Sequence, residues 1–195
     1  EGVSINKEES FKYYKMAADQ GDTRSPYYCG KMLYLGDGIP ENKEEALKYF
    51  KIGADADDYN SIIICAYMLD DGGGVPIDKQ EAIKYYKKAI NHGNMPAMNS
   101  YAFMLDYGNG IEVNKKEAAK YYKMAADKNY GIGMFNYAYM NHFGDGVPVN
   151  KEEAIKYYKM AIERGNMTAM NNYGLMLFKG DGIETNKEEA LKYFK

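Results

Sequence analysis

The sequence predicts an all-α protein built as a stack of antiparallel helix hairpins, and two observations carry this prediction. A phrase of the form N/D-K-x-E-x-x-K-Y-Y/F-K returns every 36 residues without insertion or deletion. Between its copies lies a second apolar segment that ends in G-x-G. A fixed period of roughly 20–50 residues is typical of arrays in which each unit packs against its neighbours. The copies begin at Asn6, Asn42, Asp78, Asn114, Asn150 and Asn186.

The first helix of each unit is predicted from Lys43 to about Ala54 and over the equivalent residues elsewhere. Asn42 is a candidate N-cap, and Glu45 stands three residues later, which is the spacing of a capping box. In a capping box each side chain accepts a hydrogen bond from the other residue's backbone N–H. The same spacing occurs at Asn6/Glu9, Asn42/Glu45, Asp78/Glu81, Asn114/Glu117, Asn150/Glu153 and Asn186/Glu189.

The two faces and the end of this helix are also predictable. Apolar residues recur at spacings of three and four on one side, and lysines lie on the other. We interpret the lysines as a solvated face, with a phosphate- or carboxylate-binding stripe as the alternative. A residue that tolerates the left-handed conformation is expected to end each helix. These residues are Gly21, Asp57, Gly93, Asn129 and Gly165.

The second helix is predicted from Ser25 to Leu35, with its siblings starting near residues 61, 97, 133 and 169. Small residues recur at two of its positions, which indicates close approach of neighbouring helices. A methionine column follows, interpreted as core packing. The leucine column beside it is interrupted by Asn141. The methionines are Met32, Met68, Met104, Met140 and Met176.

Each second helix ends in G-x-G followed by isoleucine or valine, as in Gly36-Asp37-Gly38-Ile39. The glycines supply the positive φ that a tight reversal requires. This is not a phosphate loop, because it follows a helix and lacks the third glycine and the lysine. It is not a calcium loop either, because alternating carboxylates are missing.

Composition and charge limit the possible partners. Apolar residues make up 46% of the 195 residues, enough for a continuous core. The 25 basic and 28 acidic residues give a net charge of −3, which argues against nucleic acid and anionic membranes as partners. No apolar run approaches the roughly 20 residues that span a bilayer.

The two cysteines, Cys29 and Cys65, occupy the same slot of neighbouring units. Equivalent points on adjacent hairpins lie about 8–10 Å apart, whereas a disulfide needs Cα atoms within about 7 Å. We therefore expect reduced core cysteines, which favours a reducing compartment such as the cytoplasm.

The succession small-x-x-x-L/Y/C-G/A-x-x-L-x-x-G-x-G-V/I, followed by the phrase above, resembles the Sel-1-like repeat family, a relative of tetratricopeptide repeats. The resemblance covers essentially the whole chain and implies a right-handed α-solenoid. It also implies a non-enzymatic scaffold or adaptor for protein partners, as in signalling or membrane quality-control complexes. The chain is then one array over residues 1–195. It comprises a trailing helix at 6–20, repeats at about 22–57, 58–93, 94–129 and 130–165, and a truncated repeat at 166–195.

Nothing in the sequence points to an enzyme, a cofactor or a metal site. His92 and His142 lie roughly one and two units from Cys65, too far for a nucleophile and its base. A secreted branch of the family has a disulfide in each repeat, and this chain lacks those cysteines. The match of Ser4-Ile5-Asn6-Lys7 to S-x-x-K has no partner motif and is interpreted as chance.

Slots that vary between units are free to build a binding site. On the second helix these slots match Tyr27, Lys31 and Tyr34, which share one helix face. By resemblance to tetratricopeptide arrays, this face lines the concave side. We call these fifteen residues the variable face. They are Tyr27, Lys31, Tyr34, Ile63, Tyr67, Asp70, Asn99, Phe103, Asp106, Phe135, Tyr139, His142, Asn171, Leu175 and Phe178.

The aromatic character of the variable face predicts that an extended segment or amphipathic helix of a partner protein binds there. A basic residue of that partner is expected to meet Asp70 and Asp106. Alternatively, the aromatic side chains only fill space between helices. A further alternative for the whole chain is a spacer, or an array that associates end to end with other copies.

Two units keep the 36-residue period but depart from its residue pattern. The second has Asp57-Asp58-Tyr59-Asn60-Ser61 before an apolar Ile62-Ile63-Ile64. The fourth has Tyr130-Gly131-Ile132-Gly133 and Asn141-His142. Such departures mark places where local consistency was given up for function, or simple drift.

Overall fold

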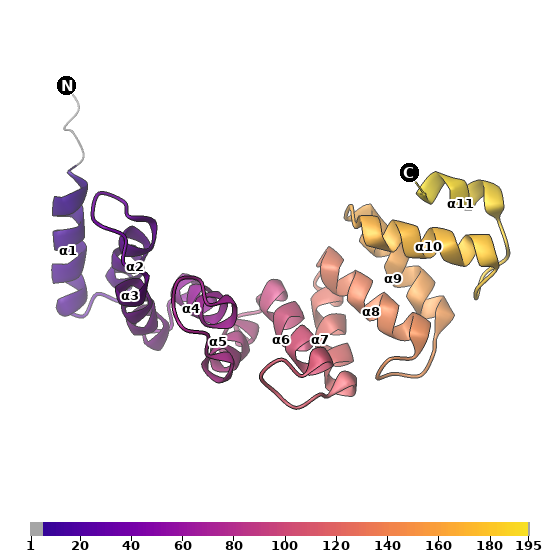
Figure 1. Cartoon of the computed structure of the whole chain (residues 1–195), viewed down its shortest axis with the longest axis horizontal. Helices are drawn as coiled ribbons and strands as arrows, with labels where there is room; N and C mark the ends of the chain where they lie inside the picture. The colour runs from indigo at the N-terminus through magenta and orange to yellow at the C-terminus, as the bar shows by residue number, and fades with distance from the viewer. Residues whose placement is uncertain (1–5, 195) are drawn as a thin grey trace, which may run out of the picture. The chain divides into compact units, whose positions relative to one another are not determined.

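The computed structural model describes residues 6–194, and within this range the fold is all-helical, with eleven helices and no strands (Figure 1). Ser4 and Ile5, from the S-x-x-K match, lie outside the described residues. The helices are α1 (Lys7–Asp19), α2 (Ser25–Leu35), α3 (Lys43–Asp55), α4 (Tyr59–Asp71), α5 (Lys79–Asn91), α6 (Met95–Tyr107), α7 (Lys115–Asp127), α8 (Gly131–Phe143), α9 (Lys151–Glu163), α10 (Met167–Lys179) and α11 (Lys187–Tyr193).

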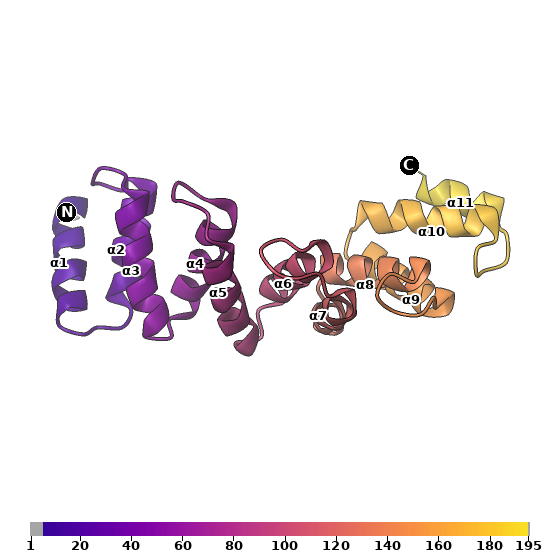
Figure 2. The ribbon, with the colours of Figure 1, turned by 60° about the horizontal axis from the view of Figure 1, so that its bottom comes forward.

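Two compact units divide the chain, one ending at Gly93 and the other beginning at Asn94. The first contains α1 to α5, which stand side by side and alternate in direction (Figures 1 and 2). The second contains α6 to α11, in which α8 packs against both α7 and α9. In each unit a helix contacts its neighbours along the chain, as expected of an α-solenoid.

The N-caps of the odd-numbered helices confirm half of the predicted capping box. In all six helices, including α3 and α7, the side chain of the N-cap residue accepts from the backbone N–H of the glutamate three residues later. The reciprocal half is wrong for Asn42, Asn114 and Asn186. Glu45, Glu117 and Glu189 accept from the amide side chains of these residues and not from their backbone N–H.

From α3 onwards, the backbone N–H of the N-cap residue of each odd-numbered helix donates to another partner, which explains why the reciprocal bond is missing. Asn114 N donates to the Leu105 carbonyl at 2.8 Å, nine residues earlier, near the end of the preceding helix. The same bond recurs at Asn42, Asp78, Asn150 and Asn186. It closes the loop after G-x-G and fixes where the next helix begins.

All five predicted left-handed residues at the ends of the first helices are confirmed, with φ from 66° at Asp57 to 90° at Gly21. Both glycines of each G-x-G also have positive φ. Gly146 illustrates a second constraint, because a Cβ atom there would lie 2.5 Å from the backbone carbon of Lys115. The loop therefore needs glycine for space as well as for conformation.

The even-numbered helices α4, α6, α8 and α10 begin two residues earlier than predicted. Asp58 caps α4 by accepting from Ser61 N at 2.8 Å, and Asn94 and Asn166 cap α6 and α10 in the same way. Tyr130 occupies this position before α8 and makes no side-chain cap bond. The irregular fourth unit thus lacks a cap that its neighbours have.

The core consists of the columns that recur between units. All five column methionines are buried, and so are the small residues such as Ala102 and Gly133. A Cβ at Gly133 would lie 2.7 Å from Ala125 Cβ, so a larger side chain would push α8 from α7. Cys29 and Cys65 are buried and unpaired, as predicted. No helix within residues 6–194 has the length and apolar character that crossing a membrane demands.

Candidate protein-interaction face

The variable face lies on α2, α4, α6, α8 and α10, and none of its fifteen residues is fully buried. Six of them belong to the first unit and nine to the second, so they form two separate sets. Nine are half-buried and six are exposed. The exposed ones are Lys31, Phe103, Tyr139, Asn171, Leu175 and Phe178.

In the first unit, the face is shallow and mostly engaged with its own chain. Tyr34 and Tyr67 line a small hollow together with Ile64 and Met68. The Tyr67 ring meets Tyr86 edge to face, with centroids 5.8 Å apart. The first unit fits the alternative expectation, in which the aromatic side chains only fill space between helices.

The second unit presents aromatic rings to solvent. Phe103 and Tyr107 lie on α6 with ring centroids 4.5 Å apart, and Tyr139 and Phe143 lie on α8 with centroids 4.6 Å apart. Their exposed fractions are 46% and 68% on α6, and 43% and 57% on α8. We call these four residues the aromatic patch. Side chains this large and this exposed contribute little to the fold around them.

Sequence reasoning missed half of this patch. Tyr107 and Phe143 occupy a fourth variable slot, four residues after Phe103 and Tyr139, and its other members are Leu35, Asp71 and Lys179. Residues four apart share a helix face. Extending the variable face by one helical turn would have found both residues.

The third slot of the variable face, which begins with Tyr34, has an internal partner. The lysine nine residues later opens the next odd-numbered helix and faces this slot. Lys43 Nζ lies 5.3 Å from the Tyr34 ring centroid, and Lys187 Nζ lies 5.4 Å from that of Phe178. These are cation–π contacts, so variation at this slot is limited to groups that tolerate a neighbouring cation.

Where the third slot is acidic, the same lysine forms an ion pair. Lys79 Nζ lies 2.6 Å from Asp70 Oδ1, and Tyr86 donates to the other carboxylate oxygen at 2.7 Å. The negative charge of Asp70 is therefore already paired within the first unit. This pairing weakens the expectation that a basic partner residue meets Asp70.

Asp106 differs from Asp70 in its pairing. Lys115 Nζ is 3.7 Å from Asp106 Oδ1, but it donates to both oxygens of Asp145 at 2.7 Å. The Asp106 side chain is 11% exposed. Burial raises the pKa of Asp106; Lys115 opposes this rise and Asp145 adds to it. Two carboxylates thus share one ammonium group.

His142 takes the third slot on α8 and reaches its lysine through an aspartate. Its Nε2 lies 2.8 Å from Asp181 Oδ2, and Lys151 donates to the other oxygen of Asp181. Hydrogen bonds from Lys151 and then His142 hold the pKa of Asp181 below its usual range. His142 also stacks on Phe143, with centroids 4.2 Å apart. The network supports one edge of the aromatic patch.

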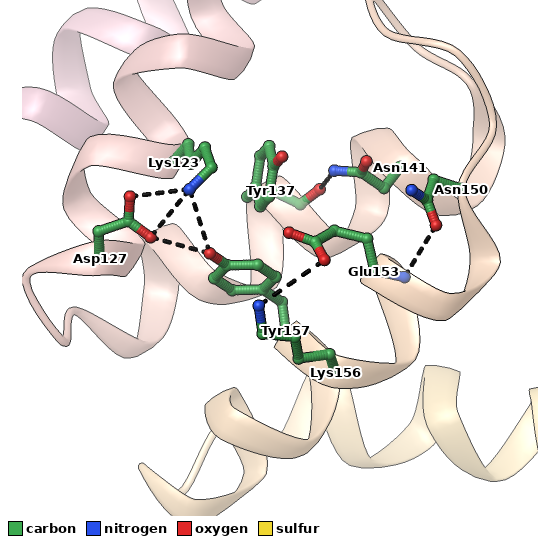
Figure 3. Close-up of polar contacts among 8 residues, drawn as sticks. All are labelled: Lys123, Asp127, Tyr137, Asn141, Asn150, Glu153, Lys156 and Tyr157. Carbon is green, nitrogen blue, oxygen red and sulfur yellow. Dashed lines mark hydrogen bonds and ion pairs between the residues drawn. The ribbon is translucent and has the colours of Figure 1, made fainter.

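The odd-numbered helices carry a polar surface with its own internal contacts. Figure 3 shows Lys123 donating to Asp127 at 2.9 Å, while the Tyr157 hydroxyl donates to Asp127 at 2.8 Å. Burial raises the pKa of Asp127, but these hydrogen bonds outweigh it and leave the pKa lowered. Such pairs fit the solvated face expected from the lysine columns.

Potential metal ligands do not cluster in the part of the chain that the structure describes. Across residues 6–194, no three His, Cys, Asp or Glu side chains are placed to hold one metal ion. Burial raises the pKa of the Cys29 thiol to about 11 and that of Cys65 to about 12. Thiols with such pKa values are inert at neutral pH.

Comparison with known proteins identifies the repeats of the chain. The family model described as "Sel1 repeat" matches residues 1–22, 27–58, 63–94, 96–130, 131–166 and 168–195. No protein with curated annotation matches the sequence significantly.

Solved structures agree with the family match. The chain is 27% identical to c5321, a protective antigen of uropathogenic Escherichia coli strains with an SLR fold, at a TM-score of 0.89. The alignment covers 99% of this chain and 41% of c5321, so the chain spans about two fifths of that protein's length. A Sel1 repeat protein from Oxalobacter formigenes is 29% identical over 98% of this chain and 77% of its own, with a TM-score of 0.76.

A third structure shows the fold alone. Helicobacter pylori cysteine rich protein B is 20% identical, with a TM-score of 0.53, over 69% of this chain and 96% of its own. Sel1 repeat proteins are generally protein-interaction scaffolds and typically not enzymes. With repeats matched along nearly its whole length and a hairpin stack in each unit, the chain belongs to the Sel1 repeat family.

Proposed function

We propose that this chain is a non-enzymatic scaffold whose second unit binds a segment of a partner protein across the even-numbered helices α6 and α8. The observation that carries the proposal is the aromatic patch, formed by Phe103, Tyr107, Tyr139 and Phe143. Each of the four residues has an exposed fraction above 40%. They occupy slots that differ from unit to unit, whereas the slots that build the fold are constant.

The aromatic patch has the properties of a protein-binding surface. Exposed apolar clusters mark interaction sites in soluble proteins. Aromatic side chains supply large, rigid contact area and dominate the binding energy of many interfaces. Tyr139 of the patch is supported from its own unit, because its ring meets Phe135, which in turn meets the buried Tyr158; each pair of ring centroids is 6.2 Å apart. A preorganised surface loses little entropy on binding.

The test uses a display library of random short peptides selected on the whole chain. The wild type is expected to enrich related sequences, and the double variant Phe103→Ala/Tyr139→Ala is expected to lose them. Met124→Ala is the matched control, because Met124 is an exposed apolar residue of α7 in the same unit. Far-UV circular dichroism monitors folding of each variant.

Two results would contradict the proposal. One is the absence of any enriched peptide on the wild type. The other is enrichment that survives in the folded double variant, since the peptides would then bind elsewhere. Loss of binding with an unchanged helical spectrum supports the patch as the docking surface.

A further inference from the structure

We propose that the pocket beside the aromatic patch selects an arginine side chain of the bound segment. The inference rests on the proposed function, which supplies the segment, and it adds the chemistry that the segment must carry. The lining of the pocket includes Phe103, Asp106, Tyr107, Phe135, Asn136 and Tyr139, beside the buried Tyr122 and Met140. We call it the Asp106 pocket.

The walls of the Asp106 pocket suit a flat cation. Phe103 and Tyr107 come from α6, and Phe135 and Tyr139 come from the neighbouring helix α8. Aromatic faces attract cations through their quadrupole. The chain already makes this contact elsewhere, since Lys187 lies over Phe178 in the same unit. Within residues 6–194, the cation–π contacts found lie on rings other than the four aromatic rings of the Asp106 pocket.

Charge complementarity identifies the sign of the ligand. Asp106, Asp145 and Lys115 contribute two negative charges and one positive charge. Lys115 bonds to Asp145 at 2.7 Å and lies 3.7 Å from Asp106. The nearly buried Asp106 carboxylate is therefore undercompensated. An acidic ligand would be repelled, and an apolar ligand would bury the carboxylate further without a partner, which is unfavourable.

The geometry of the guanidinium group favours arginine over lysine. Arginine stacks its planar head on aromatic rings and can bond a carboxylate with two parallel N–H groups. Asn136 adds a polar edge to the pocket, and its side-chain amide is oriented by a bond of 2.9 Å from Nδ2 to Asn99 Oδ1. A lysine ammonium provides a single compact charge that is strongly hydrated. Asp70, the aspartate at the equivalent slot of the first unit, differs because it is paired with Lys79 at 2.6 Å.

The experiment uses peptide display libraries that differ only in a fixed central residue: arginine, lysine, leucine or glutamate. On the wild-type chain the arginine library is expected to yield the strongest enrichment. A peptide from that library is then measured by calorimetry against Asp106→Asn, which keeps the side-chain shape and removes the charge. We expect affinity to fall by about tenfold or more, the range of a charge-assisted pair.

Asp70→Asn is the matched control, since it removes an equivalent aspartate in the first unit, and it should leave affinity unchanged. Equal or better enrichment of lysine, leucine or glutamate overturns the arginine assignment while the proposed docking surface stands. Unchanged affinity in Asp106→Asn overturns it as well. If no library is enriched on the wild type, both the docking surface and the arginine pocket are wrong. Asp106→Glu provides a second variant, expected to retain the preference for arginine.

Discussion

At the scale of single residues, Asn141 shows how one side chain can leave a column without harming the fold. It stands in the leucine column of the even-numbered helices and is buried. Its side-chain nitrogen donates to the Tyr137 carbonyl at 2.8 Å, one turn earlier (Figure 3). Its own carbonyl accepts from Asn150 N, as the leucines do at this slot. The polar group is therefore satisfied where an apolar one was expected, and its neighbour His142 can join the Asp181 network.

The two cysteines allow a prediction about pH. Burial raises their pKa values to about 11 for Cys29 and about 12 for Cys65, above the value near 8.5 of an unfolded thiol. Because thiolate is the reactive form, iodoacetamide should label neither residue in the native chain at pH 8 or 9. In urea both should react, and faster at pH 9, as mass spectrometry would show.

The sign of the associated stability change follows from the same shift. The unfolded thiols lose their protons at lower pH than the folded ones. The contribution of the two protonated thiols to the stability of the folded state is therefore complete below about pH 8.5. It declines as the pH rises towards the pKa values of the thiols in the folded state. Rapid labelling of either cysteine in the folded chain would show that the surrounding core is more accessible than the structure indicates.

At the scale of helices and loops, the repeated caps explain why the odd-numbered helices from α3 onwards begin where they do. The side chain and the backbone N–H of the N-cap residue make separate hydrogen bonds. The first accepts from a glutamate N–H in its own helix, and the second donates to the preceding helix. The helix start is thus fixed from both sides.

This division of roles predicts unequal effects of two substitutions in α7. Asn114→Ala removes the acceptor for Glu117 N, and should lower the free energy of unfolding by about 1 kcal/mol. Glu117→Ala removes an exposed contact of 3.2 Å to the Asn114 side chain. It should lower the free energy of unfolding by only a few tenths of a kcal/mol, as the loss of an exposed pair does. Urea unfolding followed by circular dichroism measures both. Equal losses of unfolding free energy in the two variants would contradict this division and favour a reciprocal capping box.

Glycine substitutions separate conformational strain from close packing. Gly165 and Gly146 have φ of 77° and 74°. A Cβ at Gly165 would meet nothing within 4 Å, whereas one at Gly146 would overlap the Lys115 backbone. Gly165→Ala should therefore cost about 1–2 kcal/mol, the left-handed penalty alone. Gly146→Ala should cost clearly more.

Thermal unfolding of both glycine variants provides the comparison. The lower midpoint is expected for Gly146→Ala, because the loop must move away from α7 to make room. A smaller loss at Gly146 than at Gly165 would contradict the close approach between this loop and the start of α7.

These elements also show what the sequence could and could not predict. Caps and left-handed ends depend on neighbours within a few residues, so Asn114 and Gly165 were predictable from local chemistry. The Asn114–Leu105 bond and the Asp70–Lys79 pair span nine residues and a loop, so they depend on how that loop closes. The variable face was found because it differs between units. Its aspartates could not be told apart, since the pairing of Asp106 depends on Asp145 in a different hairpin.

At the scale of the whole molecule, the uniform period hides a difference between the two compact units. Constant slots give each unit the same core, with buried methionines such as Met68 and Met140. In the first unit, Tyr34 and Asp70 of the variable face are engaged by Lys43 and by Tyr86 of the same unit. In the second, aromatic rings are exposed beside an undercompensated carboxylate. The proposed docking surface therefore belongs to one unit alone.

That assignment predicts where binding activity resides when the chain is divided after Gly93. All residues of the aromatic patch and the Asp106 pocket lie in residues 94–195, and so do the residues that support them, such as Phe135, Lys115 and Tyr158. A fragment 94–195 contains the core of α6 to α11 and should give a helical spectrum with its own cooperative melt. It should bind an arginine peptide selected on the whole chain with affinity within about threefold, a difference below 1 kcal/mol.

The fragment 1–93 is the matched control, because it carries the same repeat pattern with Asp70 in place of Asp106, and it should not bind that peptide. Binding by 1–93, or a large loss of affinity in a folded 94–195, would place the recognition chemistry outside the second unit. In that case, arginine selection would not be explained by the Asp106 carboxylate and the four rings of the aromatic patch. Repeat arrays are stabilised by contacts between neighbouring hairpins. Both fragments keep such contacts, so the experiment separates folding, which depends on the constant slots, from peptide binding, which depends on the variable slots.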